Sequence, residues 1–220
     1  MSFNVAIDGP AGAGKSTIAK AVAAKKGYIY VDTGAMYRSM ALFFIRAGIK
    51  ADDEAGIAAV VDDIDVSIQY VDGAQHVILN GEDVTGLIRT EEVGNMASAS
   101  SVYAPVRTKL VSLQQKLAAT ADVIMDGRDI GTVVLPNADV KVYLTASVEC
   151  RGKRRFDELT AKGIECDLEE IKKDIEERDY RDMHRDISPL RQAEDAILVD
   201  SSNMSIDEVV QAIIDLCEGK

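Results

Sequence analysis

Residues 5–17 read VAIDGPAGAGKST and contain the most specific pattern in the chain. A short apolar run, Val5 to Ile7, precedes a glycine-rich segment, and a run of helix formers follows it. The segment GPAGAGKS, residues 9–16, matches GxxxxGKS in full. In this pattern the glycines let backbone N–H groups converge on an anion, at the positive end of the following helix. The sequence therefore predicts a strand, a phosphate-binding loop and a helix, in that order.

The two residues that end this loop indicate a nucleoside triphosphate and its metal. Lys15 can reach the β- and γ-phosphates, and the Ser16 hydroxyl is the expected protein ligand of Mg²⁺. A glycine-rich turn made only for close packing is the alternative, but it needs neither the lysine nor the hydroxyl. The loop therefore predicts Mg²⁺ together with ATP or GTP, and the choice of ATP depends on the kinase interpretation given below. The residues predicted to bind ATP are Gly9, Pro10, Ala11, Gly12, Ala13, Gly14, Lys15, Ser16 and Thr17.

Further apolar runs indicate the fold class. They occur at residues 28–31, 123–125, 140–144 and 197–199, and helical patterns separate them. This alternation is typical of parallel strands with crossover helices, so the predicted class is α/β. One stretch differs: apolar runs at 66–70 and 76–79, with turn residues at 72–73 and 80–81, predict a small antiparallel hairpin as an insertion.

The bulk composition limits the class of protein. A chain of 220 residues with 47% hydrophobic residues is long enough for one globular unit. A net charge of −12 argues against a surface for nucleic acid polymers or anionic membranes. The three cysteines have no metal or disulfide spacing, which favours a reducing compartment, and no stretch is long enough to span a membrane. We expect a cytoplasmic protein, acting as a monomer.

A phosphate loop occurs in both switch GTPases and kinases. DxxG strings occur at residues 53–56 and 83–86, but no NKxD motif follows them, which argues against a GTPase. A kinase needs a second anion site built from arginines, together with a movable cover. Residues 147–191 contain seven of the twelve arginines in a helical pattern that breaks near Lys162-Gly163. This region therefore favours the kinase interpretation.

Two more arginines are predicted at the ligand-binding edge of the sheet. DTGAMYR, residues 32–38, and DGRDIGT, residues 126–132, each follow an apolar strand. In open parallel sheets ligands bind at the carboxyl ends of the strands, so Arg38 and Arg128 should lie there with the phosphate loop. An arginine in a surface salt bridge remains the alternative for each of them taken alone.

At this point the chain resembles the bacterial cytidylate kinase family from Asn4 to about Cys217. The resemblance rests on IDGPAGAGKST, VDTGAMYR, NGEDVTGLIRTEEV, MDGRDIGTVV and RDYRDMHRDISPL. It implies one kinase domain over residues 1–220, with a P-loop NTPase three-layer fold and a five-stranded parallel sheet. Residues 62–92 or so would lie within a monophosphate-binding insertion, and about 147–191 would form an arginine-rich helical lid.

The resemblance also implies an activity and a set of roles. The activity is direct in-line transfer of the γ-phosphoryl of ATP to CMP or dCMP. Asp129 would accept from the cytosine N4 amine, where uracil presents a carbonyl that a carboxylate cannot pair with. The catalytic residues would be Lys15, Arg128 and Arg185. The substrate-binding residues would be Thr33, Arg38, Ser98, Arg107, Arg128, Asp129, Arg178, Asp182 and Arg185. Asp32 would join Ser16 in the Mg²⁺ shell.

Several alternatives stay open at the level of sequence. Spacing places Arg178, Arg181, Asp182 and Arg185 on one helical face, but the same helix could be exposed and paired through Asp174 with Arg178 and Glu177 with Arg181. Arg107 could be a solvated surface arginine. The competing functions are a kinase of UMP, AMP or a non-nucleotide acid, and a nucleotide-dependent switch with slow hydrolysis.

Overall fold

The computed structural model describes residues 2–71 and 73–220. The chain divides into two compact units, Met1–Tyr30 with Ala121–Lys220, and Val31–Thr120. None of the helices in the described part of the chain combines the length and the apolar character needed to cross a membrane.

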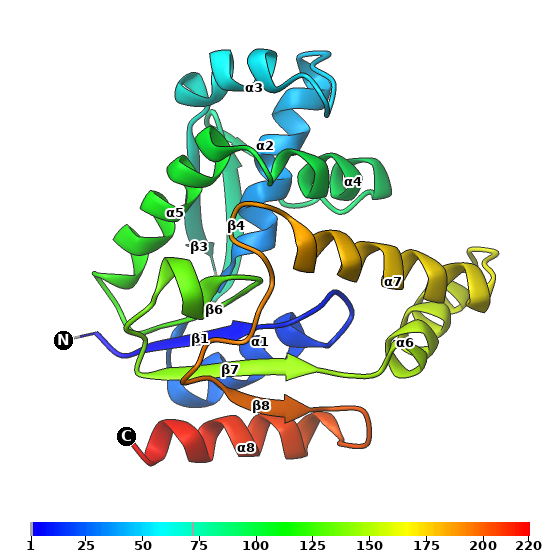
Figure 1. The fold of residues 1–220 in the computed structure, drawn as a ribbon. Coiled ribbons are helices and arrows are strands. Elements are labelled where there is room, and N and C mark those ends of the chain that lie inside the picture. Colours follow the sequence, from blue (N-terminus) through cyan, green and yellow to red (C-terminus); the bar gives the residue numbers. More distant parts are fainter. Residues whose placement is uncertain (1, 72) are drawn as a thin grey trace. The chain divides into compact units, whose positions relative to one another are not determined.

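A five-stranded sheet in the order β2-β6-β1-β7-β8 is built on the first unit (Figure 1). The strands are β1 (Asn4–Asp8), β2 (Ile29–Asp32), β6 (Val123–Gly127), β7 (Val140–Thr145) and β8 (Ile197–Asp200). β1 runs parallel to both β6 and β7, and β7 runs parallel to β8. Each strand coincides with a predicted apolar run, so the α/β class and the parallel sheet are confirmed.

Two helices pack on this sheet, α1 (Lys15–Lys26) and the amphipathic α8 (Ile206–Glu218). Val22 of α1 and Ile213 of α8 are fully buried in one cluster with Ile7 of β1. Complete burial of such a side chain stabilises the fold by roughly 1.5–3 kcal/mol. Ser205 and Glu208 form a capping box that starts α8.

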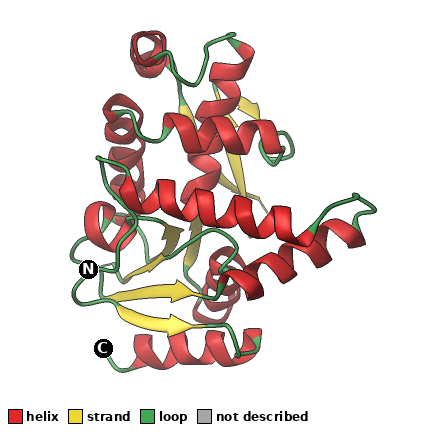
Figure 2. Ribbon diagram, turned by 45° about the vertical axis from the view of Figure 1, so that its right-hand side comes forward, coloured by secondary structure: helices red, strands yellow, loops and turns green. Residues whose placement is uncertain are grey.

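The arginine-rich region forms two helices that lie side by side in both views (Figures 1 and 2). α6 (Val148–Ala161) is capped by Ser147, and α7 (Leu168–His184) is capped by Asp167. The predicted break is present, because Gly163 has a φ of 71° and ends α6. A short π-helical turn, η2 (Ile130–Val134), follows β6.

The second unit carries the small antiparallel sheet, in the order β3-β4-β5. Its elements are α2 (Thr33–Arg46), α3 (Glu54–Val60), the 3-10 turn η1 (Val61–Asp63), β3 (Val66–Val71), β4 (Ala74–Leu79), β5 (Glu82–Asp83), α4 (Glu91–Ser100) and α5 (Ala104–Ala118). The predicted hairpin is confirmed. Asn80 and Gly81, with φ of 49° and 84°, turn the chain from β4 into β5. The other predicted turn, at residues 72–73, includes Asp72, which lies outside the described residues.

Both DxxG strings have local structural explanations. Asp53 caps α3 by accepting from the Gly56 backbone N–H at 2.9 Å. Asp83 accepts from the Thr85 backbone N–H at 3.0 Å and pairs with His76 at 2.7 Å. These carboxylates satisfy turns and caps, which agrees with the argument against a switch GTPase.

Candidate active site

The phosphate loop connects β1 to α1. Gly12 and Gly14 have φ of 77° and 90°, a region that residues with a Cβ rarely adopt. The backbone of Gly9 approaches the Leu144 carbonyl so closely that any side chain at position 9 would collide with it. The three glycines are thus required by the path of the loop, which ends at the unpaired N–H groups of the first turn of α1.

Lys15 folds back over this loop, and its Nζ donates to the Pro10 carbonyl oxygen at 2.7 Å. Burial lowers the pKa of Lys15 to about 7, and the positive charge of Arg128 acts in the same direction. The carboxylates that oppose this shift belong to Asp126, Asp182 and Asp8. An anion held by the loop would favour the charged ammonium and restore the pKa of this lysine.

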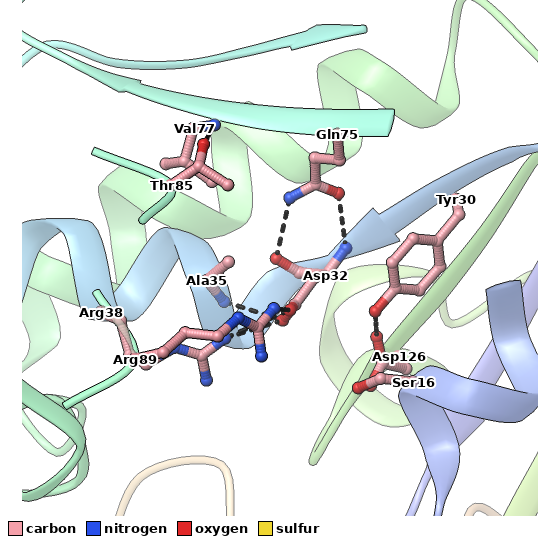
Figure 3. Close-up of polar contacts among 10 residues, drawn as sticks. All are labelled: Ser16, Tyr30, Asp32, Ala35, Arg38, Gln75, Val77, Thr85, Arg89 and Asp126. Carbon is pink, nitrogen blue, oxygen red and sulfur yellow. Dashed lines mark hydrogen bonds and ion pairs between the residues drawn. The ribbon is translucent and has the colours of Figure 1, made fainter. Parts of the chain in front are cut away.

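Ser16 forms a polar cluster with two residues that sequence analysis did not select. Its Oγ donates to Asp126 Oδ2 at 2.8 Å, and the Tyr30 hydroxyl donates to Asp126 Oδ1, also at 2.8 Å (Figure 3). A serine hydroxyl beside a carboxylate is the hard-oxygen donor set that Mg²⁺ prefers. These residues therefore fit the metal predicted from the loop, with Asp126 as the carboxylate nearest to Ser16.

Arg128 follows β6 directly and pairs with the second helix of the arginine-rich region. Its Nε donates to Asp182 Oδ2 at 2.8 Å. Burial alone would lower the pKa of Arg128, but the carboxylates of Asp182, Asp126 and Asp179 together raise it above its usual value. Burial likewise opposes ionisation of Asp182, yet Arg128 and the neighbouring arginines lower its pKa below the usual value. Both groups are thus held in their charged forms.

Asp129 is buried next to Arg128, and Arg185 Nη2 lies 3.9 Å from its Oδ1. Of the four residues predicted to share a helical face, Arg178, Arg181 and Asp182 lie in α7, but the prediction is wrong for Arg185, which lies beyond the end of the helix. α7 ends at His184, Arg185 has an extended backbone, and its Nε donates to the Ser188 carbonyl at 2.6 Å. Arg181 is exposed whereas Asp182 is buried. Beyond the end of the helix, the Leu190 N–H donates to the Asp182 carbonyl at 2.8 Å.

In the second unit, Asp32 gathers two arginines at the start of α2. It caps the helix by accepting from the Ala35 N–H at 2.8 Å. Its Oδ2 accepts from Arg38 Nη2 at 3.1 Å and from Arg89 Nη2 at 2.9 Å (Figure 3). Gln75 fixes the Asp32 backbone, since its Oε1 accepts from the Asp32 N–H at 2.8 Å. Two guanidinium groups held by one carboxylate form a concentrated positive centre that suits a phosphate.

These partners bear on the prediction that Asp32 belongs to the Mg²⁺ shell. Both of its oxygens accept from guanidinium or backbone donors. The observed role of Asp32 is to cap α2 and orient Arg38 and Arg89. Its contribution to a metal shell stays a prediction, and Asp126 is the carboxylate observed beside Ser16.

Arg107 is buried in the second unit, with 4% of the residue exposed, which excludes a solvated surface arginine. Its Nη1 donates to the Ser101 carbonyl at 3.4 Å, and its guanidinium lies 5.8 Å from the centre of the Tyr37 ring. Ser98 lies near the end of α4, where its carbonyl accepts from the Ser101 hydroxyl at 2.9 Å. Thr33 is the buried first residue of α2.

Arg151 is a further residue that sequence reasoning did not assign. It is buried on α6, and its Nε donates to the Ala146 carbonyl at 2.9 Å. Its Nη1 donates to the Ala11 carbonyl of the phosphate loop at 3.0 Å, and its Nη2 donates to Asp179 Oδ2 on α7 at 2.6 Å. Arg151 therefore ties the phosphate loop to both helices of this region. Only its place in an arginine-rich segment signalled it.

The parallel sheet, the glycine-rich loop after β1 and the buried cations beside it define a P-loop nucleotide-binding protein. Within that class, a sequence model described as cytidylate kinase matches residues 5–219. The chain therefore belongs to the cytidylate kinase family, and it is an enzyme of the kinase class. The family supports phosphorylation of a nucleoside monophosphate by ATP as the reaction class.

Individual relatives agree along nearly the full length of both chains. The chain is 53% identical over 214 residues to the cytidylate kinase of Caldicellulosiruptor saccharolyticus, covering 97% of this chain and 95% of the relative. It is 52% identical to that of Leuconostoc mesenteroides, covering 99% and 97%, and 48% identical to that of Bacillus licheniformis, covering 98% and 96%. A solved protein of uncharacterized function from Eubacterium ventriosum shares the fold, with a TM-score of 0.57 at 11% identity over the full length of both chains.

Proposed function

We propose that this enzyme transfers the γ-phosphoryl group of ATP to CMP and dCMP. One observation carries the proposal. β1 and β6 are neighbouring parallel strands with Asp8 opposite Gly127, so the phosphate loop and the Arg128-Asp129 segment leave the sheet next to each other. The segments proposed to bind the donor phosphates and to recognise the acceptor therefore start from the same edge, which is where ligands bind in open parallel sheets.

The donor half is residues 9–17. The loop N–H groups and the start of α1 would bind the triphosphate, and Lys15 would contact the β- and γ-phosphates. Ser16 would hold Mg²⁺, with Asp126 orienting the hydroxyl. Bound Mg²⁺ supplies neutralisation of the charge on the transferring phosphates.

The acceptor half is assigned by residue type and by resemblance to the family. In the first unit, Arg128 and Arg185 would bind the acceptor phosphate, and Arg178 and Asp182 the sugar. In the second unit, Arg38 would bind the acceptor phosphate, and Thr33 would contribute to substrate binding. The Asp32 cluster supports the addition of Arg89, because that side chain is 58% exposed and shares a carboxylate with Arg38.

The base would be selected by hydrogen bonding. The Asp129 carboxylate would accept from the cytosine N4 amine, whereas the O4 of uracil would face it as a second acceptor. Ser98 and Arg107 would donate to the remaining base edge. Burial of Asp129 supports this role, because an unpaired acceptor costs most where water is excluded.

The transfer itself would depend on alignment and charge neutralisation. The acceptor phosphate is largely ionised near neutral pH and needs no general base. One of its oxygens would attack the γ-phosphorus in line with the bond to the leaving ADP oxygen. Lys15, Arg128 and Arg185 would stabilise the charge, and Arg128 would exchange its bond to Asp182 for one to phosphate. Closure of residues 147–191 would exclude water and suppress hydrolysis of ATP.

We also propose that the enzyme acts as a cytoplasmic monomer on small nucleotides rather than on nucleic acid polymers. Free thiols at Cys150, Cys166 and Cys217 suit a reducing compartment. A net charge of −12 favours binding of a small phosphate ligand in a local site over binding of a nucleic acid polymer along the surface.

The test is a coupled assay of ADP formation with ATP and CMP, dCMP, UMP or AMP. The expected result is turnover with CMP and dCMP well above that with UMP and AMP. ADP release that is independent of every monophosphate would instead support a nucleotide-dependent switch.

Replacement of Asp129 tests base selection. Asp129→Ala should reduce kcat/KM for CMP far more than for UMP. Asp207→Ala, which removes an exposed carboxylate from α8, should change neither. Equal losses for CMP and UMP in Asp129→Ala would contradict this account of base recognition.

A further inference from the structure

Asp8, the last residue of β1, has both carboxylate oxygens engaged with the turn that follows β6. Oδ1 accepts from the Ile130 N–H and Oδ2 from the Gly131 N–H, each at 2.7 Å. The residue is 5% exposed. Short bonds from two backbone donors to one buried carboxylate are charge-assisted and are stronger than neutral hydrogen bonds.

These two donors open the turn η2, which begins immediately after Arg128 and Asp129. The first N–H groups of a helical turn have no partner within it. Asp8 supplies that partner from a neighbouring strand, while the Asp129 carbonyl accepts from the Val133 N–H at 2.9 Å on the other side of the turn. The backbone around Asp129 is therefore fixed from both directions.

Gly131 has little room for a side chain beside the Asp8 carboxylate. A Cβ at this position would lie 3.4 Å from Asp8 Oδ2 and 3.2 Å from Lys141 Cδ. A side chain there would press on the carboxylate or displace Lys141. Glycine thus lets the backbone N–H approach Asp8 closely.

We propose that Asp8 is a positioning residue for the acceptor nucleotide: it holds the backbone of Ile130 and Gly131 so that Arg128 and Asp129 are aimed at the acceptor. This inference rests on the proposed function of those two side chains. Asp8 acts through them and touches no substrate. It lies just before the phosphate loop, so one short segment would organise both the donor site and the acceptor segment.

The charge on Asp8 determines the strength of this contact. Burial raises its pKa to about 6, against the two backbone hydrogen bonds, which lower it. The charged or titratable groups that face it are Lys15 from α1, Asp129 from the turn, Lys141 near Gly131 and Tyr143 from β7. A protonated carboxyl has one oxygen occupied as a donor, so it cannot accept both N–H groups equally well.

The principal experiment compares Asp8→Asn with Asp139→Asn. Asp139 is the matched control, because its carboxylate accepts from the Asn4 N–H at 2.7 Å at the opposite end of β1. In Asp8→Asn the ratio of kcat/KM for CMP to that for UMP should fall roughly tenfold, the effect expected when one charge-assisted hydrogen bond is lost. The KM for ATP should change less than about threefold. Asp139→Asn should leave both quantities unchanged.

The pH dependence separates positioning from a general loss of folded protein. The ratio of wild-type to Asp8→Asn kcat/KM for CMP cancels the ionisation of the substrate phosphate. This ratio should fall toward one as the pH is lowered from 7 to 5. A ratio that is constant with pH, or an unchanged CMP-to-UMP preference in an active Asp8→Asn variant, overturns the proposal.

If Asp8→Asn does not fold, two other measurements test the positioning role of Asp8. Gly131→Ala should reproduce the loss of CMP preference with little change in the KM for ATP. In the wild type, the amide NMR signals of Ile130 and Gly131 should titrate together with a midpoint near pH 6. Amide signals that do not move between pH 5 and 7 disprove the contact whatever the enzyme phosphorylates, whereas a wild type inactive on CMP disproves the proposed function alone.

Discussion

Arg128 Nε donates to Asp182 Oδ2 at 2.8 Å, which ties the end of β6 to α7 through one ion pair. The arginine side chain is 20% exposed and the carboxylate side chain 10%. The pair holds together two segments that lie 54 residues apart in the sequence. A phosphate reaching Arg128 would compete with Asp182 for the same guanidinium.

Asp182→Asn should therefore destabilise the protein. Removal of one partner leaves the other charge buried and unpaired, which typically costs about 3–5 kcal/mol. The free energy of unfolding in urea measures this cost. Glu158→Gln is the matched control, because Glu158 pairs with Arg155 and Lys162 on the exposed side of α6 and should contribute less than about 1 kcal/mol. Equal losses in the two variants would mean that the Arg128–Asp182 pair behaves as a surface contact.

The fold was predictable where the deciding pattern is local. The apolar runs at 123–125 and 140–144 give β6 and β7, and the glycines of residues 9–14 give the loop. The two-residue strand β5 was not predicted, because it is too short to show a period. The position of Arg185 was also not predicted. α7 ends at His184, and the Leu190 N–H donates to the Asp182 carbonyl beyond that end, a contact that no local pattern in the sequence predicts.

The site residues that sequence analysis missed are those whose role depends on distant partners. Asp126 was noted only as a residue after an apolar run, and its contact with Ser16 spans 110 residues. Arg89 meets Asp32 across 57 residues, and Arg151 meets Ala11 across 140. No spacing rule links such pairs. The motifs around them were visible, but the pairing appears only in the folded chain.

Asp126→Asn should weaken the response to Mg²⁺. The amide keeps one acceptor for Ser16 but loses the charge, and groups that orient metal ligands are commonly worth about 10–100-fold in metal affinity or activity. The rate as a function of Mg²⁺ concentration at fixed ATP measures the apparent affinity. Tyr30→Phe removes one donor to the same carboxylate and leaves Ser16 in place, so its effect should be smaller. An unchanged Mg²⁺ response in Asp126→Asn would remove Asp126 from the proposed metal site.

Arg89→Ala should raise the KM for the acceptor nucleotide. Loss of a charged hydrogen bond to phosphate corresponds to roughly a tenfold change or more, while the KM for ATP should stay the same. Arg46→Ala provides the control, because Arg46 is an arginine of the same unit that pairs with the exposed Glu82. If Arg89→Ala and Arg46→Ala have the same KM for the acceptor nucleotide, Arg89 only pairs with Asp32 and does not bind the acceptor phosphate.

ATP affinity should fall as the pH rises above 7. The pKa of Lys15 in the free enzyme is about 7, and bound phosphates favour the protonated ammonium, so binding takes up a proton. Linkage then limits the decline to about one decade of affinity per pH unit. Lys15→Arg keeps its charge throughout this range, so the ratio of wild-type to variant affinity isolates the lysine from the ionisation of ATP. A ratio independent of pH between 7 and 9 would show that Lys15 stays fully protonated.

The stability of the wild type relative to Asp8→Asn should fall between pH 4 and 6. The pKa of Asp8 is raised from 3.8 to about 6, so the folded state binds more protons than the unfolded state in this interval. The favourable contribution is complete below pH 3.8 and is lost as the pH passes 6, a change of about 3 kcal/mol at most. Urea unfolding of both proteins at several pH values measures the difference, and a difference that grows with pH would contradict the raised pKa. At neutral pH the ionised Asp8 therefore lowers the free energy of unfolding while accepting the Ile130 and Gly131 N–H groups. A loss of stability together with two backbone hydrogen bonds is expected of a carboxylate whose role is to position the Arg128-Asp129 segment rather than to stabilise the fold.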